Sequence, residues 1–215
     1  MKYGETAFDL FYLIFAVISG CRILRKAKTR TGTWMGQATL ILGCGDAFHL
    51  VPRVLNYFST ADLTAALGIG KLITSLTMTA FYVYMYKIWA GVYRVKEEKN
   101  MTCAVFVLAA VRILLCLFPQ NGWRQNSSDV TWGILRNVPF VLLGALVIVL
   151  FYRNRVQNSR FRHFWLLILL SFLFYIPVAV GAGIVPMLGM LMLPKTVCYI
   201  LMIVVFRGSV FKDGQ

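Results

Sequence analysis

Seven long apolar stretches separated by short polar segments constrain this chain more than any other feature of its sequence. A helix needs about 20 mostly apolar residues to cross the hydrocarbon core of a bilayer. Charged residues make up 14% of the chain, against about a quarter in an ordinary soluble domain. The sequence therefore predicts an all-α, seven-transmembrane-helix bundle that forms one membrane domain over residues 1–215. The predicted spans cover residues 7–24, 33–57, 62–90, 101–119, 132–152, 162–182 and 186–206.

The basic residues predict the orientation of this bundle. The chain carries 22 Lys and Arg against 8 Asp and Glu, a net charge of +14. Fifteen of the 22 fall in the segments that follow spans one, three, five and seven, whereas only Lys2 and Arg124 fall on the opposite side. Because short loops rich in Lys and Arg stay in the cytosol, we expect the carboxy terminus inside and the amino terminus outside. We expect a cell membrane, a bacterial inner membrane, and no nucleic-acid partner.

A weak internal similarity links the two halves of the chain. Lys71 follows Pro52 by 19 positions, and Lys195 follows Pro177 by 18 positions. Residues 7–90 and 132–206 would then be two repeats in the same orientation, joined by a linker helix over 101–119. Parallel repeats of this kind are a known transporter plan. Chance similarity between two apolar stretches is the alternative.

The five remaining basic residues lie deeper inside the predicted spans, where ionisable groups are costly and usually face the bundle interior or a water-filled cavity. They are Arg53, Lys71, Arg112, Arg136 and Lys195. Counted at 1.5 Å per helical residue, all five fall in the outer half of the membrane. Asp46 is the one carboxylate expected deep in a span, and it cannot neutralise all five.

These cations predict an outward-facing cationic cavity for a small anionic or amphiphilic, lipid-like molecule. Arg and Lys are suited to oxyanions, so a phosphate, a carboxylate or the head group of an anionic lipid are candidates. Asp46, His49 and Arg53 share one face of the second span because they follow one another at helical spacing. Hydroxyl groups, those of Thr74, Ser75 and Thr196 among them, would add neutral donors. The predicted ligand-binding residues are Asp46, His49, Arg53, Lys71, Thr74, Arg112, Tyr175, Lys195 and Tyr199.

Other interpretations stay open. Asp46 and His49, one helical turn apart, could form the general acid–base pair of an intramembrane lipid-modifying enzyme. A seven-helix receptor or sensor would need a partner protein that the sequence does not identify. In a purely structural interpretation, Asp46 pairs with Lys71 or Arg112 and the arginines near span ends extend to the outer interface. We expect no cofactor and no metal, since the chain is poor in carboxylates and histidines.

Three families resemble parts of this pattern. Seven spans with an outside amino terminus and a 3+1+3 repeat resemble the SWEET and PQ-loop transporters, but Pro119-Gln120 stands at the end of span four. The topology and Lys195 resemble microbial rhodopsins, whose lysine binds retinal, but Leu191 stands one turn earlier where that family has an acid. Gly45-Asp46 resembles a motif of the YhhN-type lysoplasmalogenases, which have eight spans. These resemblances reach the architecture or a single motif.

Overall fold

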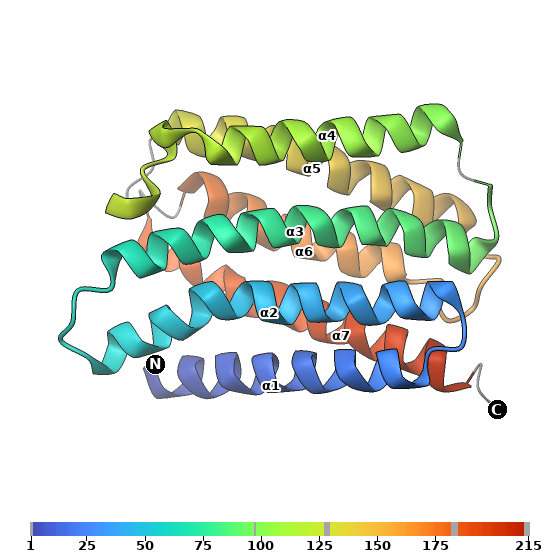
Figure 1. Ribbon diagram of the computed structural model, residues 1–215, viewed down its shortest axis with the longest axis horizontal. Coiled ribbons are helices and arrows are strands. Elements are labelled where there is room, and N and C mark those ends of the chain that lie inside the picture. Colours follow the sequence, from blue (N-terminus) through green and yellow to red (C-terminus); the bar gives the residue numbers. More distant parts are fainter. Residues whose placement is uncertain (1, 97, 127–129, 182–184, 213–215) are drawn as a thin grey trace.

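The computed structural model describes residues 2–96, 98–126, 130–181 and 185–212, and every regular element in these ranges is a helix (Figure 1). Seven α-helices and three short 3₁₀ helices follow one another along the chain. They are α1 (Lys2–Lys26), α2 (Arg30–Phe58), α3 (Thr64–Tyr93), α4 (Lys99–Leu117), η1 (Pro119–Asn121), η2 (Trp123–Gln125), α5 (Val130–Asn154), α6 (Phe164–Gly181), η3 (Pro186–Leu191) and α7 (Met192–Lys212).

Seven helices in the described part of the chain are long and apolar enough to cross a membrane, which confirms the predicted spans to within a few residues for the first six. The seventh candidate span, Met187–Phe211, also begins within a residue of the predicted start, and its first residues form η3 before α7 begins. Pro52, Pro139 and Pro177 lie inside α-helices, which neighbouring helices in a membrane bundle can tolerate. The chain is therefore a multi-pass membrane protein.

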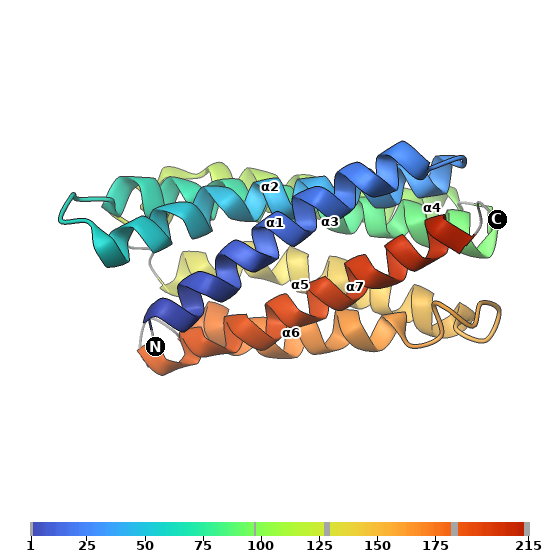
Figure 2. The same ribbon diagram turned by 90° about the horizontal axis from the view of Figure 1, so that it is seen from below.

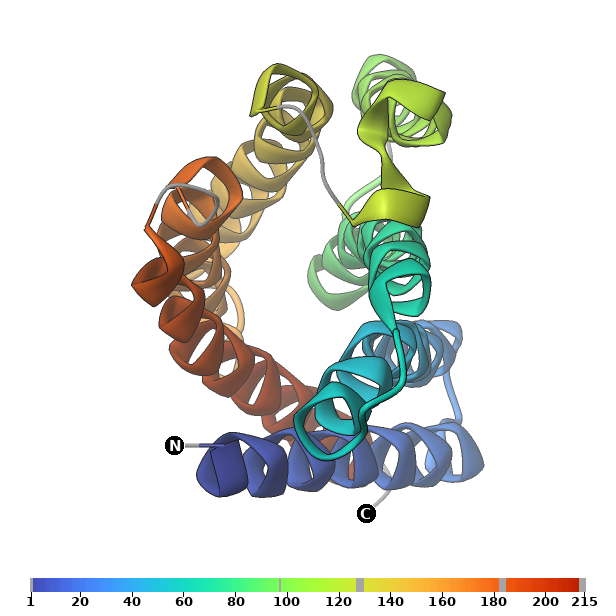
Figure 3. The same cartoon turned by 90° about the vertical axis from the view of Figure 1, so that its left-hand side faces the viewer.

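The helices form a ring in the order of the sequence. Each helix packs against the next, and α7 returns to pack against α1. Figure 3 shows this ring end on, and Figure 2 shows α1 and α7 side by side where it closes. Because successive helices alternate in direction, the amino terminus and the α2–α3, α4–α5 and α6–α7 connections share one end of the bundle (Figure 1). We call this the amino-terminal end, and the opposite one the basic end.

Apolar side chains cover much of the outside of the ring. On α1, for example, Phe11 and Ile14 are more than half exposed, and on α5 Leu142 and Val149 are as well. Soluble monomers rarely expose contiguous apolar surface of this extent. Lipid is the solvent that suits such an exterior.

Aromatic side chains fill the interior of the ring. Tyr82 of α3 is fully buried and lies at edge or tilted contact with Phe140 of α5 and Phe172 of α6, with ring centroids 5.2 Å apart in both cases. Phe81, next to Tyr82, meets Tyr199 of α7 at 6.0 Å. These rings join α3, α5, α6 and α7 in one buried aromatic core.

Candidate functional site: a cationic cavity

A cavity of about 160 Å³ lies between the helices toward the amino-terminal end. Six of the seven long helices contribute side chains to it, and α1 does not. Its lining consists of His49, Lys71, Thr74, Ser75, Met78, Arg112, Trp123, Arg136, Phe140, Tyr175, Met192 and Lys195. Six of the nine residues predicted as ligand-binding are in this set: His49, Lys71, Thr74, Arg112, Tyr175 and Lys195.

The cavity lies within a few turns of the amino-terminal end of the bundle. Lys71 stands seven residues after α3 begins, and Arg112 stands five residues before α4 ends. Arg136 and Lys195 lie in the first two turns of α5 and α7. At 1.5 Å per residue, these four cations lie roughly 5 to 10 Å from the helix ends, so they occupy one level of the bundle.

Two of the cations are held by the segment that connects α4 and α5. Lys71 Nζ donates a hydrogen bond of 2.8 Å to Asn126 Oδ1. Arg136 Nη1 donates one of 2.6 Å to Asn121 Oδ1, and the Arg136 guanidinium lies 4.5 Å from the centre of the Trp123 ring. All three partners are neutral, so these contacts position the charges without cancelling them.

The connecting segment is fixed in place by the end of α4. Asn121 Nδ2 donates to the carbonyls of Leu115 at 2.8 Å and Phe118 at 2.9 Å, which are free because the helix ends there. The backbone carbonyl of Trp123 packs directly against Gly68 of α3, where a Cβ atom would collide with it. Glycine at 68 thus lets this segment lie close over α3.

Arg112 is the most deeply buried of the four cations, with 2% of its surface exposed. Its Nη1 donates to Asn137 Oδ1 at 3.0 Å and to the Arg136 carbonyl at 3.2 Å, and its guanidinium lies 3.7 Å from the centre of the Phe140 ring. Tyr175 donates to the same Asn137 oxygen at 2.7 Å. The buried Nε of Arg112 has no hydrogen-bond partner within the described residues. Such a charge retains hydrogen-bonding capacity for a further acceptor.

Lys195 is buried against aromatic faces, with 8% of its surface exposed. Its Nζ lies 4.5 Å from the ring centre of Tyr175 and 5.4 Å from that of Tyr199. Tyr199 is buried and does not line the cavity. Cation–π contacts of this kind stabilise an ammonium group. Across the described chain, no side chain or carbonyl accepts a hydrogen bond from Nζ.

The four cations form a chain of neighbours in which each lies close enough to repel the next. Lys71 interacts with Arg136, Arg136 with Arg112, and Arg112 with Lys195. Asp46 lies within electrostatic range of Lys195 but forms no ion pair with it within the described residues. No carboxylate belongs to the cavity lining in the described ranges. For Arg112 and Lys195, the two buried members of the set, a charge without an ion-pair partner is costly.

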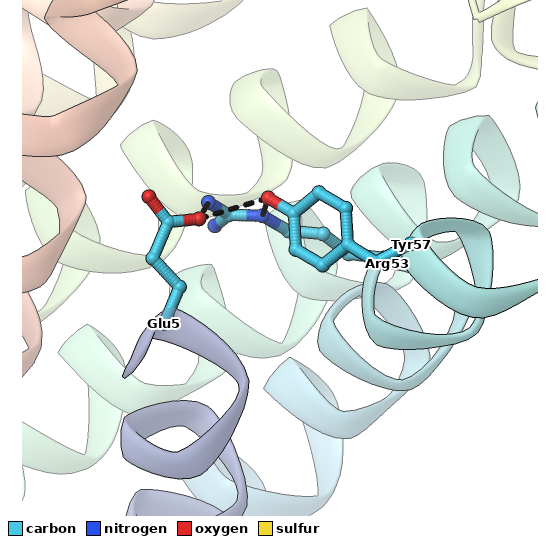
Figure 4. A network of polar contacts seen from close by, with 3 residues as sticks. All are labelled: Glu5, Arg53 and Tyr57. Carbon is cyan, nitrogen blue, oxygen red and sulfur yellow. Dashed lines mark hydrogen bonds and ion pairs between the residues drawn. The ribbon is translucent and has the colours of Figure 1, made fainter. Parts of the chain in front are cut away.

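The other predicted acidic and basic residues have partners away from the cavity. Asp46 Oδ2 accepts a hydrogen bond of 2.7 Å from Tyr12 of α1. Arg53 Nη2 forms an ion pair of 3.1 Å with Glu5 of α1, and Tyr57 donates to the same carboxylate oxygen at 2.8 Å (Figure 4). Glu5 thus forms an ion pair with Arg53, whereas none of the four cavity cations has an ion-pair partner in the described residues.

The three hydroxyl groups predicted as neutral donors already have backbone partners in the structure. The predicted neutral donors Thr74, Ser75 and Thr196 each donate to a backbone carbonyl, at 3.1, 2.8 and 2.9 Å respectively. Their hydrogens are therefore engaged, and the groups that keep hydrogen-bonding capacity for a ligand are the cations and His49, whose buried Nδ1 has no partner in the described residues.

Sequence reasoning missed the neutral partners of these cations. Asn121, Asn126 and Asn137 each accept a hydrogen bond from one of them. Asn137 stands directly after Arg136 in a predicted span, and a polar amide at that depth was a usable signal. Asn121 and Asn126 fall in a predicted outer loop, where nothing in the sequence shows that the chain folds back onto α3.

No family model, curated protein or solved structure matches this chain. The groups of His, Cys, Asp and Glu in the described residues include no set of three that could hold a metal ion. The chemistry of the site therefore follows from its own residues: four cations, three aromatic side chains and a histidine line one space.

Proposed function

We propose that this protein binds or transports a small anionic or amphiphilic molecule in the cationic cavity, which faces the outside of the cell. The observation that carries the proposal is the convergence of Lys71, Arg112, Arg136 and Lys195 on one space whose described lining holds no carboxylate. An anion there would relieve the repulsion among the cations and accept the hydrogen bonds that they still offer.

The size of the cavity favours an oxyanion or a head group over a whole lipid. Its volume of about 160 Å³ compares with a share of about 30 Å³ per molecule in liquid water. A phosphate or carboxylate group fits such a space together with a few waters. Arg112 and Arg136 supply planar guanidinium groups, which match the geometry of an oxyanion, and the two lysines supply point charges.

The proposed binding is tested by removing one cavity charge at a time. We expect Lys195→Met and Lys71→Gln each to weaken the binding of inorganic phosphate or methyl phosphate roughly tenfold or more, because a hydrogen bond to a charged group contributes about 1.5–3 kcal/mol. Binding is measured by titration calorimetry on the protein in nanodiscs of a neutral glycolipid, which contributes no phosphate of its own. Arg112→Met should have an effect of at least the same size.

Arg124→Gln is the matched control, since Arg124 lies exposed at the same end of the bundle and does not line the cavity. This variant loses the same unit of charge and should bind phosphate as the unmodified protein does. An equal loss of phosphate affinity in the control would show that the general surface potential, and not the cavity, causes the effect. Unchanged phosphate affinity in both lysine variants, with their folding verified by thermal unfolding, would contradict the proposal.

Transport, as opposed to binding, would require the opposite side of the cavity to open. Phe140 and Met78 line the cavity, and Tyr82 packs behind Phe140 in the aromatic core. A carrier would have to move these side chains apart to release its ligand toward the basic end. Uptake of radiolabelled phosphate into vesicles containing the protein separates a carrier from a binding protein.

A further inference from the structure

A second space adjoins the cavity on the outer surface of the ring. A groove of about 230 Å³ lies between α5 and α6. Apolar side chains make up its lining apart from Asn137 and Tyr175. The full lining is Ile134, Asn137, Val138, Val141, Leu142, Tyr175, Ile176, Ala179 and Val180.

The groove and the cationic cavity meet at a pair of hydrogen-bonded side chains. Tyr175 lines both spaces, and Tyr175 OH donates to Asn137 Oδ1 at 2.7 Å. Arg112, which lines the cavity, donates to that same oxygen at 3.0 Å. One side of this pair therefore faces a cation and the other faces the apolar groove, where Val138 and Ile176 are well exposed.

From this shared boundary we propose that the ligand is an anionic amphiphile with a single alkyl chain, whose head group occupies the cavity and whose chain passes beside Tyr175 into the groove between α5 and α6. The inference rests on the proposed function and names the ligand class for that same site. A charged head group and an apolar chain need adjoining spaces of opposite character, and these two spaces share a boundary. Together they reach the lower end of the usual range for small-molecule sites, about 300–1,000 Å³.

The groove would act by holding the chain in place rather than by hydrophobic attraction. Lipid tails are as apolar as the groove, so moving a chain from the bilayer into it yields little hydrophobic energy. A chain seated there keeps its head group beside the cavity and raises the effective concentration of that group at the cations. The volume of the groove suits one chain segment rather than a two-chain lipid, and its opening toward the exterior gives a lateral route from the membrane.

The probe for this inference is dodecyl phosphate, compared with methyl phosphate, on the full chain in neutral glycolipid nanodiscs. Dodecyl phosphate with a photoreactive diazirine near the chain end should label the groove segments 134–142 and 176–180, as mapped by mass spectrometry. Filling the groove with Val138→Phe plus Ala179→Phe should weaken dodecyl phosphate binding tenfold or more and leave methyl phosphate binding unchanged. Val149→Phe plus Leu173→Phe is the matched control, because both residues are more than half exposed on the same two helices and outside the groove.

The outcomes separate this inference from the function on which it rests. Unchanged dodecyl phosphate binding in the groove-filled variant, or labelling confined to other faces of the bundle, overturns the placement of the chain. If methyl phosphate binds to the unmodified protein while the groove variants behave as the control does, the anion site stands and the groove proposal fails. If neither phosphate binds to the unmodified protein, both proposals fail together.

Discussion

Asn137 is the residue on which the site depends most closely. Its side-chain oxygen accepts from Arg112 and from Tyr175, and its Nδ2 donates to the carbonyl of Gly133 at 2.8 Å. A neutral amide here positions a buried cation and leaves its charge available. A carboxylate in the same position would form an ion pair with Arg112 and cancel that charge.

Two substitutions at Asn137 therefore separate its role in folding from its role in binding. Asn137→Asp keeps the acceptor for Arg112 and loses only the donor to the Gly133 carbonyl, so it should cost no more than about 1 kcal/mol in stability, but it should weaken phosphate binding tenfold or more by neutralising Arg112. Asn137→Leu removes the side-chain acceptor and leaves the buried Arg112 guanidinium with only the Arg136 carbonyl, which should cost about 2 kcal/mol or more in the free energy of unfolding.

Thermal unfolding in detergent and phosphate titration check the two effects separately. The proposal that net positive charge is the binding feature would be contradicted by an Asn137→Asp variant that folds and still binds phosphate with unchanged affinity. A stable Asn137→Leu variant would instead show that Arg112 finds another acceptor.

At this scale the sequence predicts the charges better than it predicts their surroundings. A Lys or Arg inside an apolar span stands out by its cost alone, so the sequence by itself singles out Lys71, Arg112, Arg136 and Lys195. Which cation has a carboxylate partner depends on contacts between distant segments. Arg53 meets Glu5 across 48 positions of sequence, and no local spacing rule relates the two.

At the scale of helices, α2 and α3 pack closely because small residues stand where their backbones meet. A Cβ added at Gly70 of α3 would collide with the backbone of Phe48 and His49 of α2, and one added at Gly45 would collide with the side chain of Thr77. Small residues at helix contacts are a common means of close packing in membranes. This contact places Lys71, next to Gly70, beside His49 at the cavity wall.

Gly70→Ala should separate α2 from α3 and destabilise the bundle by about 1–3 kcal/mol, because the obstructing atoms belong to the backbone and cannot rotate away. Phosphate binding should weaken as well, since Lys71 shifts with the helix. Gly133→Ala is the control: it also lies in a helix, and apart from the neighbouring backbone of that helix and its two chain neighbours no described atom comes within 4 Å of the added carbon. Thermal unfolding of both variants is the measurement, and equal stability of the two would show that the contact between α2 and α3 yields easily.

The sequence predicts the helices well because length and apolarity suffice for a span. It also locates the seventh span, but not its division into η3 (Pro186–Leu191) and α7, which begins at Met192. Both segments are apolar, and hydropathy does not distinguish a 3₁₀ helix from an α-helix. Lys195 therefore lies in the first turn of α7.

The predicted repeats over 7–90 and 132–206 stay a prediction. Lys71 is exposed and bonded to Asn126, whereas its counterpart Lys195 is buried between tyrosines.

At the scale of the whole molecule, the two sets of cations lie at opposite ends of the bundle. The α1–α2, α3–α4 and α5–α6 connections and the carboxy terminus share the basic end (Figure 1), and they carry most of the Lys and Arg in the sequence. The cationic cavity lies toward the other end. If the basic end faces the cytosol, as the distribution of loop charges predicts, the cavity faces outward, and its ligand arrives from outside the cell or from the outer leaflet.

This orientation is testable with two single cysteines in a background whose native cysteines are replaced by serine or alanine. Thr60→Cys lies in the α2–α3 connection and Gln157→Cys in the α5–α6 connection, and both positions are exposed. A membrane-impermeant maleimide should label Thr60→Cys in intact cells and Gln157→Cys only after the membrane is opened. The reverse pattern would turn the cavity toward the cytosol. The binding proposal would survive that result, because it depends on the charges in the cavity, but the ligand would then be a cytosolic anion or an inner-leaflet amphiphile.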